Sequence, residues 1–431
     1  MNYPKVLIIG ESFHMESGGG ITLSNLFEDW PPDKLALIGS HRTLKKTDTS
    51  KYKNFYQIGE KETFLLFPFC LFQKKYSSGT IITNQKFADS KLINLSAKRD
   101  VLIDIYLLFT HFFGIYHAIN RYRISKELLE FSINFKPDYI YSQLSTRELI
   151  FFVNQLIIKT KVPSAIHIMD DWPKTINAFG ILKKYWDKKI DSEFKKLLSY
   201  VELKLAISDS MRTEYESRYG GNWLTFHNPI STSKWVPFQK YDYKVEQKLK
   251  ILYVGRIGTA NSQTIKHFSK SLITFMYETD VEFSIFSPNY NEEIGLKLKK
   301  NKNTLVKPPI NHEEIPNLVS KYDLLYLPLD FNKTTNKFSK LSMPTKMSEY
   351  MISGVPILIH SPSNTAIFKY AKHKNFAYLL DSLKSERIHE ALIEIIENEE
   401  TRKKHGRKSK EIAIKDFESK LVKEKFLKIF L

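Results

Sequence analysis

Lys250-Ile-Leu-Tyr-Val-Gly255 repeats the pattern with which the chain opens, Lys5-Val-Leu-Ile-Ile-Gly10. Each segment is a short apolar run that ends at a glycine, which is typical of a buried strand followed by a tight turn. A first strand that recurs in the second half of the chain predicts a second domain built like the first. The polar, aperiodic stretch at 231–250 lies between the two and is expected to join them.

Other short apolar runs have the same setting, in which a turn signal and then a helical pattern follow the run. Buried strands that alternate with amphipathic helices predict parallel sheets wound by βαβ crossovers. We therefore expect an α/β fold with two Rossmann-like domains that face each other across a cleft. The remaining predicted strands are Leu35–Gly39, Asp138–Tyr141, Ala165–Met169, Leu203–Ser208, Leu224–Phe226, Val281–Phe286, Leu324–Leu327, Val355–Ile359 and Phe376–Leu380.

The chain of 431 residues is long enough for two full domains, which we place at residues 1–235 and 250–415. In open parallel sheets, ligands bind beyond the carboxyl ends of the strands. Functional residues are therefore sought in the loops that follow the predicted strands.

The net charge of +18 is distributed unevenly: +10 over residues 1–250, +1 over 251–400 and +7 over 401–431. No recognised nucleic-acid module and no interleaving of basic and aromatic side chains accompanies it, so nucleic acid is not an expected partner. The single cysteine, Cys70, excludes an intramolecular disulfide and a cysteine-based metal site. With no secretory h-region at its start, the chain is expected to be cytoplasmic.

The first unusual loop contains Gly18-Gly19-Gly20 ahead of a predicted amphipathic helix. Glycines there would let a ligand approach the backbone, and a helix N-terminus favours an anion, although a flexible surface loop explains the pattern equally well. A second loop begins with Asp170-Asp171-Trp172-Pro173. Its carboxylates are candidates for a catalytic base or for binding substrate hydroxyls, and a metal site is a minor alternative.

The second domain contributes the other candidates. Arg256 lies between two glycines at a strand end and is well placed to bind a phosphate, although a structural arginine on a turn explains the pattern equally well. In Ser342-Met-Pro344-Thr345-Lys346-Met-Ser-Glu349, we expect Ser342 to cap a helix that Gly354 ends. The N–H groups near Thr345 and Lys346 would then face a phosphate, and Glu349 could accept hydrogen bonds from the vicinal hydroxyls of a ribose.

Together these motifs resemble the retaining glycosyltransferases of family four, which have the GT-B fold. In the family, two glutamates lie eight positions apart near the end of this motif; Glu349 matches the second and Leu341 stands at the first, as in a subgroup with a Ser-x-Pro-Thr-Lys motif. The resemblance also implies that the last helix, 416–431, packs back on the N-terminal domain. The matching segments are the glycine loop, Lys136–Tyr141, Asp170–Pro173, Ile207–Ser210, Asn228–Pro229, Tyr253–Arg256 and Pro344–Pro356.

The resemblance implies transfer of a sugar, with retention, from a nucleotide-diphosphate sugar to a glycan or lipid-linked acceptor hydroxyl in the assembly of bacterial cell-surface polysaccharide or glycolipid. It implies no cofactor and no metal. Asp170 or Asp171 would be the catalytic candidate. The donor nucleotide and its phosphates would lie against Gly19, Gly20, Arg256, Thr345, Lys346 and Glu349.

Two alternatives stay open: another enzyme on the same fold, such as a nucleotide-sugar epimerase or a phosphorylase, and a non-catalytic module that binds anionic polymers. Phe64–Phe72 is too short to span a membrane, and Val101–Ile119 carries an aspartate and two histidines. If the last helix returns to the first domain, the basic excess of residues 1–250 and that of residues 401–431 lie on one side of the molecule. That side, with these aromatic stretches, is expected to contact anionic lipid at the inner leaflet.

Overall fold

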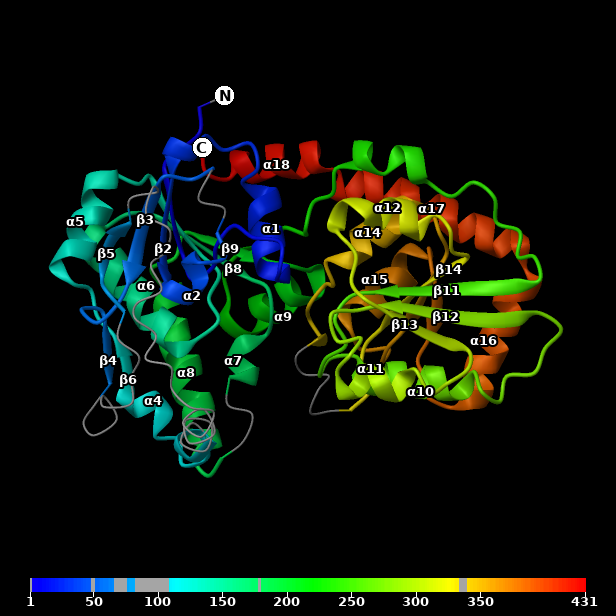
Figure 1. The fold of residues 1–431 in the computed structure, drawn as a ribbon. Helices are drawn as coiled ribbons and strands as arrows, with labels where there is room; N and C mark the ends of the chain where they lie inside the picture. The colour runs from blue at the N-terminus through cyan, green and yellow to red at the C-terminus, as the bar shows by residue number, and fades with distance from the viewer. Residues whose placement is uncertain (1, 48–50, 66–75, 82–107, 177–179, 333–338) are drawn as a thin grey trace. The chain divides into compact units, whose positions relative to one another are not determined.

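The computed structural model describes the chain except residues 1, 48–50, 66–75, 82–107, 177–179 and 333–338 (Figure 1). The chain divides into two compact units. Unit 1 consists of Met1–Phe226 and Lys423–Leu431, and unit 2 of His227–Val422. The predicted boundaries, 1–235, 250–415 and 416–431, differ from this division because the connecting segment packs on unit 2, where the Lys240 amide donates to the Ser353 carbonyl at 2.8 Å.

Unit 1 is built on a sheet of eight strands among the described residues, in the order β10-β9-β8-β7-β1-β2-β3-β5. Neighbouring strands are parallel apart from the last pair, in which β5 runs antiparallel to β3. The bounds are β1 Val6–Ile9, β2 Leu35–Ser40, β3 Asn54–Ile58, β5 Gly79–Ile81, β7 Tyr139–Ser142, β8 Ser164–Ile168, β9 Leu203–Ala206 and β10 Trp223–Thr225. A separate antiparallel pair joins β4 Thr63–Leu65 to β6 Asn120–Tyr122.

The helices of unit 1 connect these strands, and α6 packs against both α5 and α8. Their bounds are α1 Gly18–Leu26, α2 His41–Leu44, α4 Tyr116–Ile119, α5 Lys126–Phe135, α6 Arg147–Thr160, α7 Trp172–Thr175, α8 Lys183–Leu198 and α9 Asp209–Tyr219.

Unit 2 contains a parallel sheet of six strands within the described residues, in the order β13-β12-β11-β14-β15-β16. The bounds are β11 Lys248–Val254, β12 Asp280–Phe286, β13 Thr304–Lys307, β14 Leu324–Pro328, β15 Ile357–His360 and β16 Tyr378–Leu380. Helices α12, α14 and α17 lie over one face of this sheet, and α10 and α11 lie over the other (Figure 1). The bounds are α10 Ser262–Ser271, α11 Glu293–Leu298, α12 Ile315–Val319, α14 Lys346–Ser353, α15 Ala366–Lys374, α16 Ser385–Glu397 and α17 Glu399–Phe417, with 3-10 turns η3 Thr232–Lys234, η4 Val236–Phe238 and η5 His312–Glu314.

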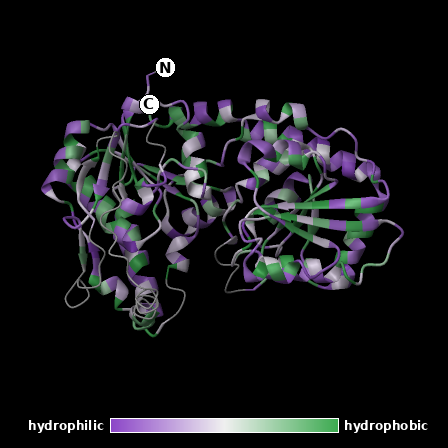
Figure 2. Cartoon of the chain, in the orientation of Figure 1, coloured by the Kyte–Doolittle hydropathy of each residue, from purple (hydrophilic) through white to green (hydrophobic). Residues whose placement is uncertain are grey.

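The predicted α/β architecture with two Rossmann-like domains is confirmed, and every strand expected from the apolar runs is present. The central strands are buried on both faces, which is why they are hydrophobic along their length (Figure 2). Each sheet also buries a tyrosine–histidine pair on neighbouring strands. The Tyr141 hydroxyl lies 2.7 Å from His167 Nδ1 in unit 1, and the Tyr326 hydroxyl lies 2.8 Å from His360 Nδ1 in unit 2.

The chain ends on unit 1, as the resemblance implies. Helix α18, Ser419–Lys428, brings Phe426 against Phe27 with ring centroids 5.1 Å apart, and Phe430 against Tyr139 at the same distance. Both phenylalanines are buried. The last residues therefore complete the core of the first domain.

The distribution of the basic excess needs a correction. Of the +7 carried by residues 401–431, +5 lies on residues 401–422, which belong to unit 2, because α17 packs along α14. Only +2 returns to unit 1, and there Lys423 pairs with Glu28 at 3.0 Å and with Asp29 at 2.8 Å. Most of the C-terminal charge therefore belongs to unit 2.

Of the two aromatic-rich stretches, Phe64–Leu65 and residues 108–119 are described, whereas 66–72, with Cys70, and 101–107 lie outside the described residues. Among the described helices, none has both the length and the apolar character needed to cross a bilayer.

Candidate functional site

Helix α14 begins at Lys346 and ends at Gly354, which adopts a left-handed conformation with φ of 72°. The predicted end is confirmed, but the start is later than expected. Ser342 does not directly precede the helix, and Thr345 stands at the N-cap position with helical backbone angles and no side-chain capping bond. The first-turn N–H groups of α14 therefore receive no cap from Thr345.

Lys346 lies across the carboxyl end of β11. Its Nζ donates to the Tyr253 hydroxyl at 3.1 Å and lies 4.6 Å from the centre of that ring. Gly255 has φ of +139°, a backbone conformation that favours glycine, and a Cβ atom there would come within 2.1 Å of Nζ, so the lysine would have to shift. The glycine that follows β11 thus leaves room for the lysine.

Burial lowers the pKa of Lys346 to about 8, and the nearby charge of Glu349 opposes this shift only in part. Among the residues that the structure describes, no carboxylate lies within ion-pair distance of Nζ. A buried ammonium without a counter-ion is costly, and a bound phosphate would supply the missing negative charge.

Arg256 follows in the same loop and is exposed, with no ion pair to a described residue. The loop itself is held firmly. The carbonyl of Arg256 accepts from the Tyr253 hydroxyl at 2.7 Å and from Asn261 Nδ2 at 3.2 Å, and the Ile257 amide donates to Asn289 Oδ1 at 3.0 Å. The guanidinium is therefore attached to a fixed backbone and is free to meet an anion.

Glu349 lies in the first turn of α14 with a side chain only 13% exposed, and burial raises its pKa. His312, from η5 after β13, places Nε2 3.5 Å from Glu349 Oε1 and favours the charged carboxylate. The hydroxyl of the next residue, Tyr350, accepts from the Val254 amide at 3.0 Å and so fastens α14 to β11. The structure thus brings Arg256, Thr345, Lys346 and Glu349 to one end of the unit 2 sheet.

Other helix N-termini at the strand ends already carry a partner. In α10, the buried carboxylate of Asp330 accepts from the Thr264 amide at 2.9 Å. In α1, Ser17 Oγ accepts from the Gly20 amide at 3.0 Å. Helix α14 differs from both, because Thr345 gives it no side-chain cap and a buried cation adjoins its first turn. This helix is therefore the better anion site of the three.

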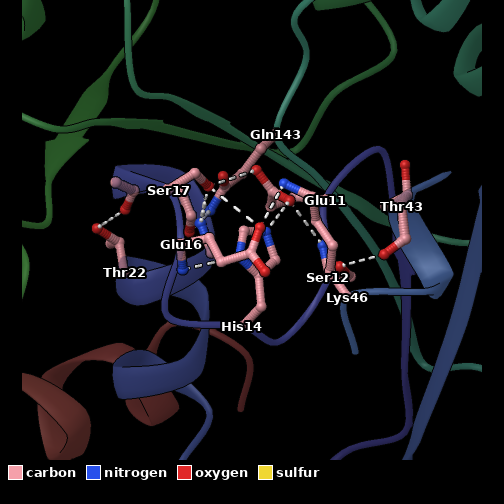
Figure 3. A network of polar contacts seen from close by, with 12 residues as sticks. Glu11, Ser12, His14, Glu16, Ser17, Thr22, Thr43, Lys46 and Gln143 are labelled. Carbon is pink, nitrogen blue, oxygen red and sulfur yellow. Dashed lines mark hydrogen bonds and ion pairs between the residues drawn. The ribbon is translucent and has the colours of Figure 1, made fainter. Parts of the chain in front are cut away.

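The glycine loop of unit 1 is filled by the chain's own side chains (Figure 3). Gly19 and Gly20 are predicted to admit a ligand, and they lie within the first turn of α1 rather than before it. A Cβ atom on Gly19 would lie 2.8 Å from Glu11 Oε2, and one on Gly20 would lie 2.6 Å from His14 Nε2. Glu11 also accepts from the Ser12 amide at 3.0 Å and lies 3.1 Å from His14 Nε2. A carboxylate therefore already adjoins this helix N-terminus, which disfavours a second anion.

Asp170 and Asp171 follow β8 in different surroundings, since Asp170 is exposed and Asp171 is buried. Arg218 grips both oxygens of Asp171 at 2.7 and 2.8 Å, and the Tyr215 hydroxyl donates to Oδ1 at 3.0 Å. These contacts explain Asp171 as a structural group of unit 1. Asp170 is the more exposed of the two.

No family model matches the sequence, and no curated protein matches it. Solved structures do match over almost the full length of both chains. Anabaena HepE, in complex with UDP and glucose, has a TM-score of 0.59 at 12% identity and covers 99% of each chain. The chain has the GT-B fold. Thermosynechococcus elongatus sucrose-phosphate synthase matches with a TM-score of 0.60 at 12% identity (99% of this chain, 98% of that one), and a Rickettsia africae glycosyltransferase with 0.59 at 12% (100% and 98%).

Several residues of this candidate site are not apparent from sequence. His312 lies in a segment that predicts only α/β packing, and its pairing with Glu349 depends on β13, a strand that the apolar runs do not reveal. Asn261 carried a weak signal, because it follows the glycines of the Arg256 loop by a few residues. Within the described part of the chain, no group of three or more His, Cys, Asp or Glu is suited to hold a metal ion.

Proposed function

We propose that this protein transfers a sugar from a nucleotide-diphosphate sugar to an acceptor hydroxyl. The observation that carries the proposal is the partly buried ammonium of Lys346, which has no carboxylate partner among the described residues and adjoins the first turn of α14. A diphosphate matches this pair of features in charge and size. The GT-B fold, shared with enzymes that include HepE in complex with UDP and glucose, supports the proposal, and we take UDP-glucose as the first donor to test.

The donor would lie at the end of the unit 2 sheet. The α14 N–H groups near Thr345, the Lys346 ammonium and the Arg256 guanidinium would hold the two phosphates, and the Glu349 carboxylate would accept from the ribose hydroxyls. These groups stabilise the charge that grows on the diphosphate as the sugar leaves, which is where catalysis gains most. The design requires neither a metal nor another cofactor.

Transfer breaks the bond between the anomeric carbon and the phosphate oxygen and forms one to the acceptor oxygen. We propose retention, with the departing phosphate oxygen taking the acceptor proton, so that no protein nucleophile is needed. Asp170, exposed after β8, is the carboxylate that would orient the acceptor on unit 1. A glycan or lipid-linked acceptor in bacterial cell-surface polysaccharide or glycolipid assembly, used in the cytoplasm at the inner face of the membrane, fits this reaction.

Glu349→Gln is expected to weaken UDP binding by about 10- to 100-fold, because the ribose hydroxyls would then donate to a neutral amide instead of to a charged carboxylate. Binding of inorganic pyrophosphate, which has no ribose, is expected to stay unchanged. Isothermal titration with both ligands measures the difference. Glu313→Gln, an exposed glutamate in η5, is the matched control. Equal losses for UDP and pyrophosphate would contradict the ribose role.

Arg256→Ala is expected to weaken UDP and pyrophosphate alike, by about tenfold, because it removes a charge-assisted phosphate contact. The thermal midpoint of the unliganded protein should not change, since the guanidinium is exposed and unpaired among the described residues. Arg387→Ala, on the exposed face of α16, serves as the control. If Arg256→Ala bound both ligands like wild type, the phosphates would have to lie elsewhere.

The reaction class is decided by product analysis. NMR of the donor incubated alone separates transfer from epimerisation, because an epimerase needs no acceptor. Conversion of the donor into another nucleotide sugar would overturn the transferase proposal. A mobility shift with anionic polymer that persists at about 0.15 M salt, without UDP binding, would instead favour a polymer-binding module.

A further inference from the structure

A cluster of large apolar side chains is exposed at one place on unit 1. The cluster, named here the apolar patch, comes from residues 108–113 and from the start of α8 with the two residues before it. Single exposed hydrophobic residues are common, but a contiguous group of this kind marks a contact surface. Its members, 38% to 66% exposed, are Leu108, Phe109, Phe112, Phe113, Ile181, Leu182 and Tyr185.

The two segments of the apolar patch are joined by backbone contacts. The Ile181 amide donates to the Phe112 carbonyl at 2.8 Å. Gly180 has φ of +116°, and a Cβ atom on it would lie 2.5 Å from the same carbonyl oxygen. Gly114 has φ of +67°, and its Cβ would lie 2.8 Å from Leu182 Cβ. The patch is therefore a built surface, whose segments meet only because glycines stand at both crossings.

The core beneath the patch is already filled. Trp186, one residue after Tyr185, is buried, with its ring 5.2 Å from that of His117 and 4.8 Å from the Arg147 guanidinium. Ile190 is fully buried on the same helix. The exposed side chains consequently have no inner site to occupy, and no part of unit 1 that the structure describes covers them.

The charge next to the patch favours an anionic surface. The acidic side chains of α8 form ion pairs with basic side chains: Asp187 with Lys183, Asp191 with Lys195 and Glu193 with Arg147. Lys184 and Lys188, one helical turn apart beside Tyr185, are exposed and have no acidic partner among the described residues. The surface thus combines aromatic and aliphatic side chains with uncompensated lysines.

We propose that the apolar patch, with Lys184 and Lys188, seats unit 1 on an anionic lipid bilayer. Partial insertion of apolar side chains and attraction of lysines to acidic headgroups are the two contributions that together bind a protein to a membrane surface. A second copy of the chain is a poorer occupant, because a symmetric contact would bring the same two lysines from both copies together. The inference goes beyond the proposed reaction and does not depend on the donor site.

Flotation at about 0.15 M salt with vesicles of phosphatidylglycerol and phosphatidylcholine, compared with phosphatidylcholine alone, tests the proposal. Wild type should float with the anionic vesicles. Phe112→Ser with Ile181→Ser should reduce binding about a hundredfold, and Lys184→Gln with Lys188→Gln roughly twentyfold. Ile133→Ser with Ile158→Ser, which are 54% and 51% exposed elsewhere on unit 1, and Lys159→Gln are the matched controls and should bind like wild type.

The affinity of each variant for UDP is measured by titration and should not change. A failure of the donor site is then distinguished from a failure of the membrane surface. The proposal is overturned if wild type does not float with anionic vesicles, or if the patch variants float with them as well as the control variants do. It is also overturned if light scattering shows a dimer that the Phe112 and Ile181 substitutions dissociate, because the patch would then be a contact between copies.

Discussion

Lys346→Met is expected to weaken binding of both UDP and inorganic pyrophosphate by about three orders of magnitude, while leaving the unliganded protein at least as stable as wild type. The loss is large because Lys346 is a desolvated cation that would meet the diphosphate directly, and truncating one partner of a buried charge pair costs about 2–5 kcal/mol. Methionine keeps most of the volume against Tyr253 and Gly255. Removing an unpaired buried charge is neutral or stabilising.

Isothermal titration measures the loss of affinity, and thermal denaturation measures the stability of the unliganded protein. Lys270→Met, an exposed lysine in the last turn of α10, is the control and should change neither. A variant that lost stability without losing diphosphate affinity would show that Lys346 serves the fold and not the ligand. The comparison with Glu349→Gln is informative too, because only the lysine variant should fail to bind pyrophosphate.

The same lysine predicts a pH dependence. Its folded-state pKa is about 8, below the ordinary value of 10.5, so between these values the unfolded chain binds the proton more tightly. The free energy of unfolding should therefore rise with pH in this window, by at most about 1.4 kcal/mol per pH unit, and Lys346→Met should remove this rise. Affinity for UDP should fall in the same window, because the ammonium is lost. Denaturation and titration at pH 7, 8 and 9 check both directions.

Arg218→Ala is expected to lower the free energy of unfolding by about 3–5 kcal/mol, because it leaves the buried Asp171 carboxylate without its cation. The side chains of Arg218 and Asp171 are only 15% and 7% exposed. Arg218 Nε also donates to Glu214 Oε1 at 2.6 Å. Burial alone would lower the pKa of Arg218, but its hydrogen bonds and ion pairs with Asp171 and Glu214 hold that pKa above the usual range. Chemical denaturation measures the loss.

Arg212→Ala is the matched control on the same helix. Its ion pairs with Asp209 and Glu216 are 3.6 and 3.7 Å long and more exposed, so it should cost no more than about 1 kcal/mol. In a double-mutant cycle, Asp171→Ala should recover part of the loss caused by Arg218→Ala. If Asp171→Ala abolished transfer while the unfolding free energy stayed at the wild-type value, the structural role would be rejected.

The strands were predictable because parallel strands buried on both faces are short, continuous apolar runs, as in Val6–Ile9 and Leu324–Pro328. Strands β3 and β13 escaped prediction, since Asn54 and Gln57 interrupt the first, and the second alternates buried and less buried residues. A local pattern reveals a strand when its apolar run is uninterrupted. Where other residues interrupt the run, tertiary pairing decides.

The donor-side candidates followed from spacing within one helix, because a lysine and a glutamate three residues apart share its first turn whatever surrounds them. The partners of those residues could not be read in this way. Arg218 lies far along the chain from Asp171, and the side chains that fill the glycine loop, Glu11 and His14, reveal their role only once α1 is placed. Contacts made by tertiary structure decide whether a candidate is open to a ligand or already engaged.

The return of the chain to unit 1 also governs the order in which the protein can fold during synthesis. Domains generally fold from the N-terminus as they emerge from the ribosome. Here Phe27, Trp30 and Tyr139 receive their aromatic neighbours Phe426 and Phe430 only from the last helix. Part of the core of the N-terminal domain therefore stays uncovered until the C-terminal domain has been made and residues 423–431 have left the ribosome.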